Sequence, residues 1–251
     1  MTDTRTALIT GAAKRLGRAI ALDLARHGWN VAIHHNTSER EARATCEDAR
    51  SAGAKAVLVK ADLAHEQETA TVVERAAQEL GPITALINNA SVFENDQWYS
   101  ADRDSWHRHM EVNLRAPLVL SQNFAKQLPK DRDGAIVNLL DQRLIRPAPD
   151  FLSYGVSKAG LRWLTMTLAQ ALAPRIRVNA LAPGPILRGA RQTAAHFERE
   201  RSATILGHGA EPQDICDTVR YLLEARAVTG QMIAVDGGQH LIWKLADMAE
   251  E

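Results

Sequence analysis

Short apolar runs alternate with amphipathic segments along almost the whole chain. Apolar runs rich in β-branched residues predict buried strands, and segments with apolar residues at helical spacing predict the helices between them. Strands are predicted at residues 6–10, 30–34, 56–59, 85–88, 135–140, 176–181 and 231–235, and helices at 15–27, 39–51, 66–80, 104–128, 153–173 and 212–224.

The alternation of strands and helices predicts how the chain is arranged in space. Parallel neighbours in a sheet need a crossover between them, and a helix usually makes it. We therefore expect one doubly wound α/β domain over residues 1–251, with helices on both faces of a parallel sheet. The least regular stretches, at about 92–103, 142–152 and 185–210, follow strand carboxyl ends, where ligands bind in such sheets.

The composition adds few constraints to this picture. The 251 residues are 45% hydrophobic and 24% charged, as in a soluble globular protein. Lys plus Arg and Asp plus Glu both number 30, so bulk charge favours neither a nucleic-acid nor a membrane partner. No apolar run approaches the ~20 residues that span a bilayer, and no signal-peptide pattern opens the chain. Cys46 and Cys216 lie outside any metal-ligand spacing, so we expect reduced thiols, no metal site and a cytoplasmic protein.

A glycine-rich segment, TGAAKRLG at residues 10–17, lies between the first predicted strand and the first predicted helix. Such a turn lets the backbone approach a pyrophosphate, and the helix N-terminus stabilises the negative charge. Gly11 and Gly17 fit this role, whereas Arg15 stands where a middle glycine is usual. The segment predicts a dinucleotide site; the alternative is a tight turn without a ligand.

The end of the second predicted strand indicates which dinucleotide is bound. It reads His-His-Asn at residues 34–36, and the first carboxylate after it is Glu39. A site that prefers NAD usually places Asp or Glu here, on the ribose 2′-hydroxyl. Lys14, with Arg40 as a second candidate, could instead meet a 2′-phosphate. We therefore expect NADPH or NADP, although a plain polar strand end remains the alternative for both histidines.

Tyr154 and Lys158 are four residues apart in a predicted helix, so both side chains lie on one helix face. A phenol with a pKa of about 10 is a poor acid–base catalyst at neutral pH. A cation within ~4–6 Å favours the phenolate and lowers that pKa. The pair therefore predicts proton transfer, although the spacing alone also fits a helix surface with a solvated lysine.

The glycine-rich segment and the Tyr154/Lys158 pair belong to a series of seven motifs. The order of these motifs resembles that of the short-chain dehydrogenases/reductases across nearly the whole length of the chain. The full series is residues 10–17, Asp62-Leu63, Asn88-Asn89-Ala90, Asn113, Tyr154 to Lys158, Pro183-Gly184 and Asp236-Gly237-Gly238. The resemblance implies a seven-stranded Rossmann sheet, a nicotinamide cofactor and a homotetramer built through helix pairs.

The same resemblance implies roles for individual residues. Asp62 would meet the adenine, and Asn89 and Ala90 would lie on the adenosine ribose side. Tyr154 and Lys158 would contact the nicotinamide ribose, and the nicotinamide face would be lined by Pro183, Gly184 and Ile186. Asn113 would hold a water or bend its helix on a proton path to Lys158. The residues expected to bind the cofactor are Gly11, Lys14, Arg15, Leu16, Gly17, His34, His35, Asn36, Asp62, Leu63, Asn89, Ala90, Ser91, Tyr154, Lys158, Pro183, Gly184 and Ile186.

Departures from the general family pattern narrow the substrate. Asp141 replaces the usual serine thirteen positions before Tyr154, and Ser91 and Phe93 follow the Asn-Asn-Ala tripeptide. With Arg15, these features are similar to the pteridine reductases. That resemblance places Arg15, Ser91, Phe93, Asp141 and Tyr154 around a pterin, with Phe93 stacked on one ring face and the nicotinamide on the other.

The chemistry of these residues suits a flat heterocycle. An aromatic side chain stacks on a planar ring, and a carboxylate accepts hydrogen bonds from its amino and N–H groups. A negative Asp141, however, opposes a phenolate at Tyr154. Either Asp141 shares a proton with the site, or Tyr154 stays a neutral donor. Phe93 as a loop-packing residue and Asp141 as a strand-end cap remain the alternatives.

Three functions follow from these observations. The first is an NADPH-dependent reductase of a pterin or similar heterocycle, with Asn113, Asp141, Tyr154 and Lys158 as the catalytic group. The second keeps the chemistry but reduces a carbonyl compound, such as a 3-oxoacyl thioester or a ketone. An ionised Asp141 speaks against it, because a carbonyl oxygen needs a donor. The third is a catalytically silent NADPH-binding sensor, which retention of the tyrosine and lysine disfavours.

Overall fold

The computed structural model describes residues 5–189 and 192–243, and its centre is a parallel sheet with the strand order β3-β2-β1-β4-β5-β6-β7. Every neighbouring pair of strands runs in parallel. The predicted doubly wound Rossmann-type fold with seven strands is therefore confirmed. The strands are β1 (Thr6–Ile9), β2 (Asn30–His35), β3 (Ala56–Lys60), β4 (Ala85–Asn88), β5 (Gly134–Leu139), β6 (Ile176–Pro183) and β7 (Met232–Val235).

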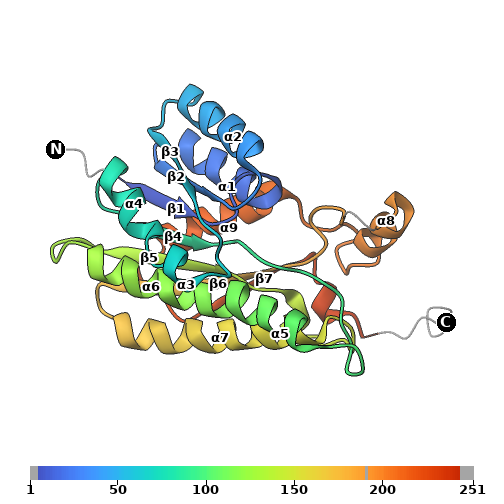
Figure 1. Cartoon of the computed structure of the whole chain (residues 1–251). Coiled ribbons are helices and arrows are strands. Elements are labelled where there is room, and N and C mark those ends of the chain that lie inside the picture. Colours follow the sequence, from blue (N-terminus) through green and yellow to red (C-terminus); the bar gives the residue numbers. More distant parts are fainter. Residues whose placement is uncertain (1–4, 190–191, 244–251) are drawn as a thin grey trace.

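Helices cover both faces of the sheet (Figure 1). In β1, Ala7 and Ile9 pack into the core under α1, α2 and α9, whereas Leu8 packs into the core under α4 and α6. The strand is therefore buried on both sides, which explains its continuous apolar run. The helices are α1 (Arg15–Arg26), α2 (Glu39–Ser51), α3 (Glu66–Thr69), α4 (Val72–Leu80), α5 (Arg103–Met110), α6 (Ala116–Gln127), α7 (Leu152–Leu172), α8 (Ala194–Ser202) and α9 (Pro212–Glu224).

Three helical segments differ from the predictions. The helix predicted at 66–80 is two helices, α3 and α4, because the Thr71 hydroxyl bonds back to the Glu68 carbonyl at 2.9 Å and competes with the helix ladder. The helix predicted at 104–128 contains a π-helical turn, Glu111–Arg115, between α5 and α6. The irregular stretch predicted at 185–210 contains α8, whose sequence AAHFERERS has no apolar stripe for a periodicity argument to detect.

The sheet order creates one switch point. From β1 the chain moves outward through β2 and β3, and β4 then pairs with the opposite side of β1. In such sheets the crevice for a ligand lies beyond the carboxyl ends of the strands at this position. Thr10, which follows β1, ties these ends together: its amide donates to Ile87 O at 3.0 Å, and its hydroxyl accepts from the Ala90 amide at 2.9 Å.

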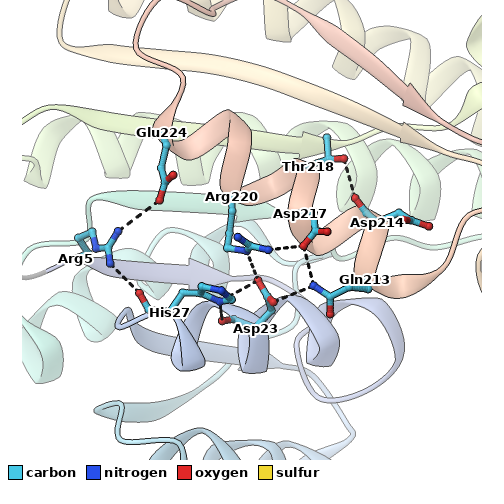
Figure 2. Close-up of polar contacts among 9 residues, drawn as sticks. All are labelled: Arg5, Asp23, His27, Gln213, Asp214, Asp217, Thr218, Arg220 and Glu224. Carbon is cyan, nitrogen blue, oxygen red and sulfur yellow. Dashed lines mark hydrogen bonds and ion pairs between the residues drawn. The ribbon is translucent and has the colours of Figure 1, made fainter.

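A polar network holds α9 against α1 (Figure 2). The buried Asp23 carboxylate on α1 accepts hydrogen bonds from Arg220 Nε at 2.9 Å and Gln213 Nε2 at 3.2 Å, both on α9. At the end of α9, Arg5 pairs with Glu224 at 3.6 Å. A buried carboxylate needs such partners, so the helix after the 185–210 stretch is fixed to the helix that follows the glycine-rich turn.

Within the part of the chain that the structure describes, no helix has the length and apolar character needed to cross a bilayer. The same residues contain no group of three or more His, Cys, Asp or Glu side chains that could hold a metal ion. Cys46 and Cys216 are both buried free thiols.

Candidate active site

The glycine-rich turn after β1 is closed by contacts that leave no room for side chains at its glycines. Gly11 has a φ of 62°, in the region that favours glycine. A Cβ added to Gly17 would lie 2.3 Å from Gly11 O and 2.6 Å from Asn89 Nδ2. The Asn89 amide donates to Thr10 O at 2.8 Å and Gly11 O at 3.2 Å. The turn is thus held by Asn89 from the end of β4.

His34 supports the same turn from β2. Its Nδ1 accepts a hydrogen bond from the Gly11 amide at 3.1 Å, and its Nε2 lies 3.1 Å from Ala61 O. These partners require a neutral ring with the proton on Nε2. Burial lowers the pKa of His34 to about 4, which keeps the ring neutral. Both ring nitrogens of His34 are used inside the protein, so the residue positions the turn, and its contact with the cofactor stays a prediction.

The first turn of α1 carries the groups that a phosphate needs. Lys14 occupies the N-cap position without a side-chain cap, so the amides of the first helical turn have no side-chain acceptor. Uncapped amides at a helix N-terminus form a site for an anion. The Lys14 side chain is exposed, Leu16 is half-buried and Gly17 is buried against the turn. These residues fit the pyrophosphate of a dinucleotide.

Arg15 connects the glycine-rich turn to the segment after β6. Its φ of 53° explains why a glycine is usual at this position. The guanidinium donates to Leu187 O at 3.1 Å and Arg188 O at 3.0 Å. The sequence predicts that this side chain bridges a cofactor phosphate and the substrate ring; in the structure two of its N–H groups bind backbone carbonyls across the crevice.

The predicted adenine side lies at the ends of β2 and β3. His35 is the last residue of β2 and is buried, whereas Asn36 after it is exposed. Asp62 follows β3; its Oδ1 accepts from the Ala64 amide at 3.0 Å, and Leu63 is buried in the core below. The structure brings these residues to the same edge of the sheet as the glycine-rich turn, as predicted.

The predicted nicotinamide side lies at the ends of β6 and β7. Pro183 ends β6, and a Cβ added to the following Gly184 would lie 2.6 Å from the Asp236 Cβ. The Asp236 carboxylate, which is buried, accepts from the Gly238 amide at 2.9 Å. Ile186 is also buried. The sequence motif Asp-Gly-Gly therefore supports the loop that the resemblance places beside the nicotinamide.

Tyr154 and Lys158 lie on the buried face of α7, as their spacing predicts. The Tyr154 hydroxyl donates to Asp141 Oδ2 at 2.8 Å, and Lys158 Nζ donates to Leu139 O at 2.8 Å. Lys158 Nζ lies 5.7 Å from the centroid of the Tyr154 ring. Asp141 Oδ1 accepts from the Arg143 amide at 2.8 Å. The aspartate is thus both a strand-end cap and the partner of the tyrosine.

The electrostatics of this group differ from the simplest prediction. Burial raises the pKa of the Tyr154 phenol well above its usual value, and the negative charge of Asp141 adds to the effect. Burial also lowers the pKa of Lys158 to about 8, although Asp141 opposes that shift. The expectation that Lys158 lowers the pKa of Tyr154 is therefore wrong for this site. The raised pKa favours the second alternative, in which Tyr154 stays a neutral hydrogen-bond donor.

Asn113 lies in the π-helical turn and is fully buried. Its Nδ2 donates to Val92 O at 2.9 Å and Ser157 Oγ at 3.1 Å, and its Oδ1 accepts from the Val92 amide at 2.8 Å and the Ser91 hydroxyl at 3.2 Å. The π-helical turn interrupts the regular helix at Asn113, whereas the role of this residue on a proton path to Lys158 stays a prediction. The side chain fixes the segment after β4 to α7 at Ser157, the residue directly before Lys158.

Phe93 lies beside Tyr154. Its ring is 4.7 Å from the Tyr154 ring in an edge-to-face arrangement, and it is stacked on Phe151 with centroids 4.2 Å apart and planes 2° apart. Phe93 is nevertheless 53% exposed. The Arg143 guanidinium lies 4.7 Å from the Phe151 centroid. Phe93 is thus a packing residue on one side and is open to a ligand elsewhere.

A buried polar cluster lies at the start of α7, the helix that carries Tyr154 and Lys158. Phe151 occupies the N-cap position with a φ of 56° and makes no side-chain cap. Asp96, from the loop after β4, accepts from the Ser153 amide at 3.0 Å and from the Ser153 hydroxyl. His109 Nδ1 lies 2.7 Å from the same hydroxyl, and its Nε2 accepts from the Glu94 amide at 3.2 Å. A carboxylate distant in sequence therefore supplies the missing cap.

Sequence reasoning did not identify Asp96, His109, Arg143, Phe151 or Ser153. The first two are separated from α7 by more than forty residues, and no local pattern signals their contact. Arg143 and Phe151 lie in the 142–152 stretch that was predicted only as irregular. The position of that stretch, after β5 and before α7, was the only indication in the sequence that these two residues lie near the site.

The arrangement can bind a dinucleotide along the turn, hold a planar ring near Phe93 and give it a proton from Tyr154. Tyr154 is 5% exposed and Lys158 is 2% exposed, so both polar groups work in a largely desolvated site. Electrostatic interactions are stronger in such an environment than in water. These features describe proton transfer coupled to a bound redox cofactor.

Known proteins resemble the chain over nearly its whole length. A family model described as Enoyl-(Acyl carrier protein) reductase matches residues 11–240. The 3-oxoacyl-[acyl-carrier-protein] reductase FabG of Staphylococcus aureus is 31% identical over 243 residues, 95% of this chain and 99% of that protein. The crystal structure of FolM Alternative dihydrofolate reductase 1 from Brucella canis, complexed with NADP, is 47% identical with a TM-score of 0.93 and covers 98% of this chain and 97% of that one. The corresponding protein from Brucella suis, in complex with NADP, is 46% identical with a TM-score of 0.91, covering 98% and 99%.

The family model spans most of the sequence, and the curated and crystallographic relatives cover nearly all of it. The chain belongs to the short-chain dehydrogenase/reductase family.

Proposed function

We propose that the protein is an NADPH-dependent reductase of a pterin or dihydropteridine-like heterocycle. The observation that carries this proposal is the 2.8 Å hydrogen bond between Tyr154 and Asp141 at a site bordered by the exposed ring of Phe93. A carboxylate at this position accepts the N–H donors of a pterin, and an aromatic ring suits its flat face. The two FolM relatives, named as alternative dihydrofolate reductases, support the same substrate class.

The cofactor site fits NADPH in this proposal. The amides of the first turn of α1 would bind the pyrophosphate, Lys14 the 2′-phosphate, and Tyr154 and Lys158 the nicotinamide ribose. The bound cofactor supplies the hydride. The FolM relatives contain NADP in their crystals, which supports the choice of dinucleotide.

Tyr154 would supply the proton. Because its pKa is raised, the phenol keeps its proton across neutral pH and remains available as a donor. When the substrate ring approaches, the Tyr154 hydroxyl turns from Asp141 Oδ2 to the ring nitrogen that becomes basic as the hydride arrives. Asp141 then accepts an N–H or amino group of the substrate, and protonated Lys158 stabilises the negative charge left on the phenol oxygen.

The consumption of NADPH by purified protein tests the proposal directly. We expect turnover with 7,8-dihydrobiopterin or dihydrofolate that exceeds turnover with any member of a ketone panel. Good ketone turnover without any pterin turnover would contradict the pterin proposal but leave the reductase assignment. Absence of turnover with all substrates, despite tight NADPH binding, would favour the catalytically silent sensor.

The second candidate is reduction of a carbonyl compound such as a 3-oxoacyl thioester. It is favoured by the FabG relative and by the description of the matching family model. Asp141→Ser separates the two candidates, since serine offers a carbonyl oxygen a donor that an ionised carboxylate lacks. A pterin reductase should lose pterin turnover in this variant, whereas a carbonyl reductase should gain ketone turnover.

We also propose a homotetramer. α5 and α7 expose large apolar side chains, including Trp106, Trp163 and Met166, that an interface between copies would bury. Light scattering after size-exclusion chromatography measures the mass. A monomer at micromolar concentration would contradict the proposal.

A further inference from the structure

Arg143 lies close behind Asp141, beyond the end of β5. It lies in a short 3₁₀ turn, Gln142–Leu144, directly after Asp141. Its amide donates to Asp141 Oδ1 at 2.8 Å, while Asp141 Oδ2 accepts from Tyr154. The backbone of Arg143 is therefore fixed to the catalytic group, and its side chain begins at the edge of the substrate site.

The guanidinium of Arg143 lies beside the aromatic pair of that site. Its Cζ atom is 4.7 Å from the Phe151 centroid and 5.8 Å from the Phe93 centroid. Its charged partner is Asp150, with Nη1 and Oδ1 separated by 3.6 Å. The Arg143 side chain is 29% exposed, so it is not fully enclosed by the protein, although its Nη1 atom is buried.

Among the described residues, the guanidinium of Arg143 donates no hydrogen bond, and its buried Nη1 has no hydrogen-bond acceptor. A guanidinium has five N–H donors, and leaving such donors unsatisfied in a partly desolvated place is costly. Arg115 shows what a satisfied guanidinium looks like in the same chain: it binds both carboxylate oxygens of Glu66 at 2.7 and 2.6 Å. Arg143 is therefore held in place by its neighbours, while its guanidinium keeps N–H donors that no described residue accepts.

We propose that Arg143 binds a carboxylate that the substrate carries outside its planar ring. The inference rests on the proposed function and sharpens its substrate class to a pterin with an acidic tail, as in dihydrofolate. Phe93 and Asp141 recognise the ring, which leaves the neighbouring guanidinium for an anion. A carboxylate is the acceptor that matches a guanidinium in charge and in geometry. An unconjugated pterin offers no such group.

A second role for Arg143 must be distinguished from this one. Its positive charge opposes the shifts that raise the pKa of Tyr154. If Arg143 acted only through Tyr154, its removal would change the turnover of every substrate alike. Substrate binding through a carboxylate changes the ratio between an acidic-tailed pterin and an unconjugated one. The ratio, rather than the absolute rate, is therefore the decisive measurement.

The experiment compares Arg143→Gln and Arg143→Lys with the wild type, using NADPH with dihydrofolate and with 7,8-dihydrobiopterin. We expect Arg143→Gln to lower kcat/KM for dihydrofolate at least about tenfold more than for dihydrobiopterin, chiefly through KM, because a charge-assisted hydrogen bond is lost. Arg143→Lys should keep part of the preference for dihydrofolate, because lysine retains the positive charge but lacks the planar, bidentate donor geometry of the guanidinium. Arg146→Gln, an exposed arginine of the same loop, is the matched control and should leave the ratio within about twofold.

Calorimetric binding of folate and biopterin to the protein with NADP gives a readout that does not require turnover. A loss of folate preference in Arg143→Gln supports the inference, and an equal effect on both ligands overturns it. A wild type that turns over and binds both pterins equally also overturns it, while the proposed function stands. A wild type that binds and reduces neither pterin overturns the proposed function and this inference together.

Discussion

The cofactor side and the substrate side of the site treat their polar groups in opposite ways. Beside the glycine-rich turn, both ring nitrogens of His34 and both amide hydrogens of Asn89 are used inside the protein. Beside the catalytic tyrosine, Phe93 is half exposed and the Arg143 guanidinium donates no hydrogen bond to a described residue. On the cofactor side, these polar groups have hydrogen-bond partners within the protein. On the substrate side, the Arg143 guanidinium has none among the described residues.

This difference explains how each side recognises its ligand. On the cofactor side, buried side chains hold the backbone so that the uncapped amides of α1 would face the phosphates of the proposed cofactor. On the substrate side, the side chains themselves offer an aromatic face, a carboxylate and a guanidinium. We therefore expect substitutions near the turn to act through geometry and stability, and substitutions near Tyr154 to act through chemistry and specificity.

Removing the Tyr154 hydroxyl should have the largest effect. Tyr154→Phe should lower kcat for the pterin by at least about 10²-fold while NADPH affinity changes less, because general acid catalysis contributes that much. Steady-state kinetics and cofactor titration measure the two effects. Tyr221→Phe, an exposed tyrosine on α9, is the control. An unchanged rate in Tyr154→Phe would remove its assigned role and weaken the contrast between the two sides.

Adding a side chain at Gly17 in the glycine-rich turn should mainly weaken cofactor binding. In Gly17→Ala the new Cβ would clash with Gly11 O, and overpacking of this kind costs about 1–3 kcal/mol. We expect NADPH affinity to fall about tenfold to a hundredfold, measured by fluorescence titration. Gly53→Ala is the control, since its φ of 92° makes it unfavourable although no atom lies within 4 Å of the added Cβ. Normal affinity in Gly17→Ala would show that the turn tolerates movement.

Acidification should lower the stability of the folded protein through protonation of His34. The pKa of His34 is lowered from 6.5 to about 4, so the unfolded chain binds this proton more readily than the folded protein between these values. Stability should therefore decrease as the pH falls from 6.5 towards 4, by about 2 kcal/mol between pH 7 and pH 5.

Urea unfolding at both pH values tests this expectation. His34→Gln should lose this part of the pH dependence, whereas the exposed His107→Gln should retain it. If His34→Gln and the wild type lose the same stability on acidification, His34 is not the group responsible.

Lys14 should contribute the smallest effect, because it is exposed on the cofactor side. Lys14→Ala should reduce the preference for NADPH over NADH about tenfold, as expected for one charged contact with a 2′-phosphate. Relative kcat/KM values for the two cofactors provide the measurement, with the exposed Lys130→Ala as control. A wild type that prefers NADH would contradict the assignment of Lys14.

The sequence predicted those features whose causes are local. Apolar runs revealed the strands because burial on both faces leaves a continuous pattern, and the four-residue spacing of Tyr154 and Lys158 placed both on one face of α7. The place of Asp141 beside Tyr154 came from the family resemblance and is confirmed by their hydrogen bond.

Features that depend on distant contacts were not predicted. The cap that Asp96 gives to α7 and the contact of His34 with Gly11 join segments that no periodicity relates. The direction of the Tyr154 pKa was predicted only as an alternative, since it depends on burial and on the position of Asp141. The stacking of Phe93 on Phe151 joins segments that are distant in the sequence, and Phe151 adopts a positive φ that phenylalanine seldom takes, so no local pattern indicated it.

The π-helical turn Glu111–Arg115 sets the rotation of α5 about its axis relative to α6. An α-helix advances about 100° per residue, so deletion of one residue from this turn would restore a regular helix only by rotating α5 about its axis relative to α6. Asn113 could then no longer face Val92 while α5 kept His109 beneath the start of α7. The wide turn therefore fixes a phase between two stretches of one helix, and relatives of this protein should vary in side chains here more readily than in length.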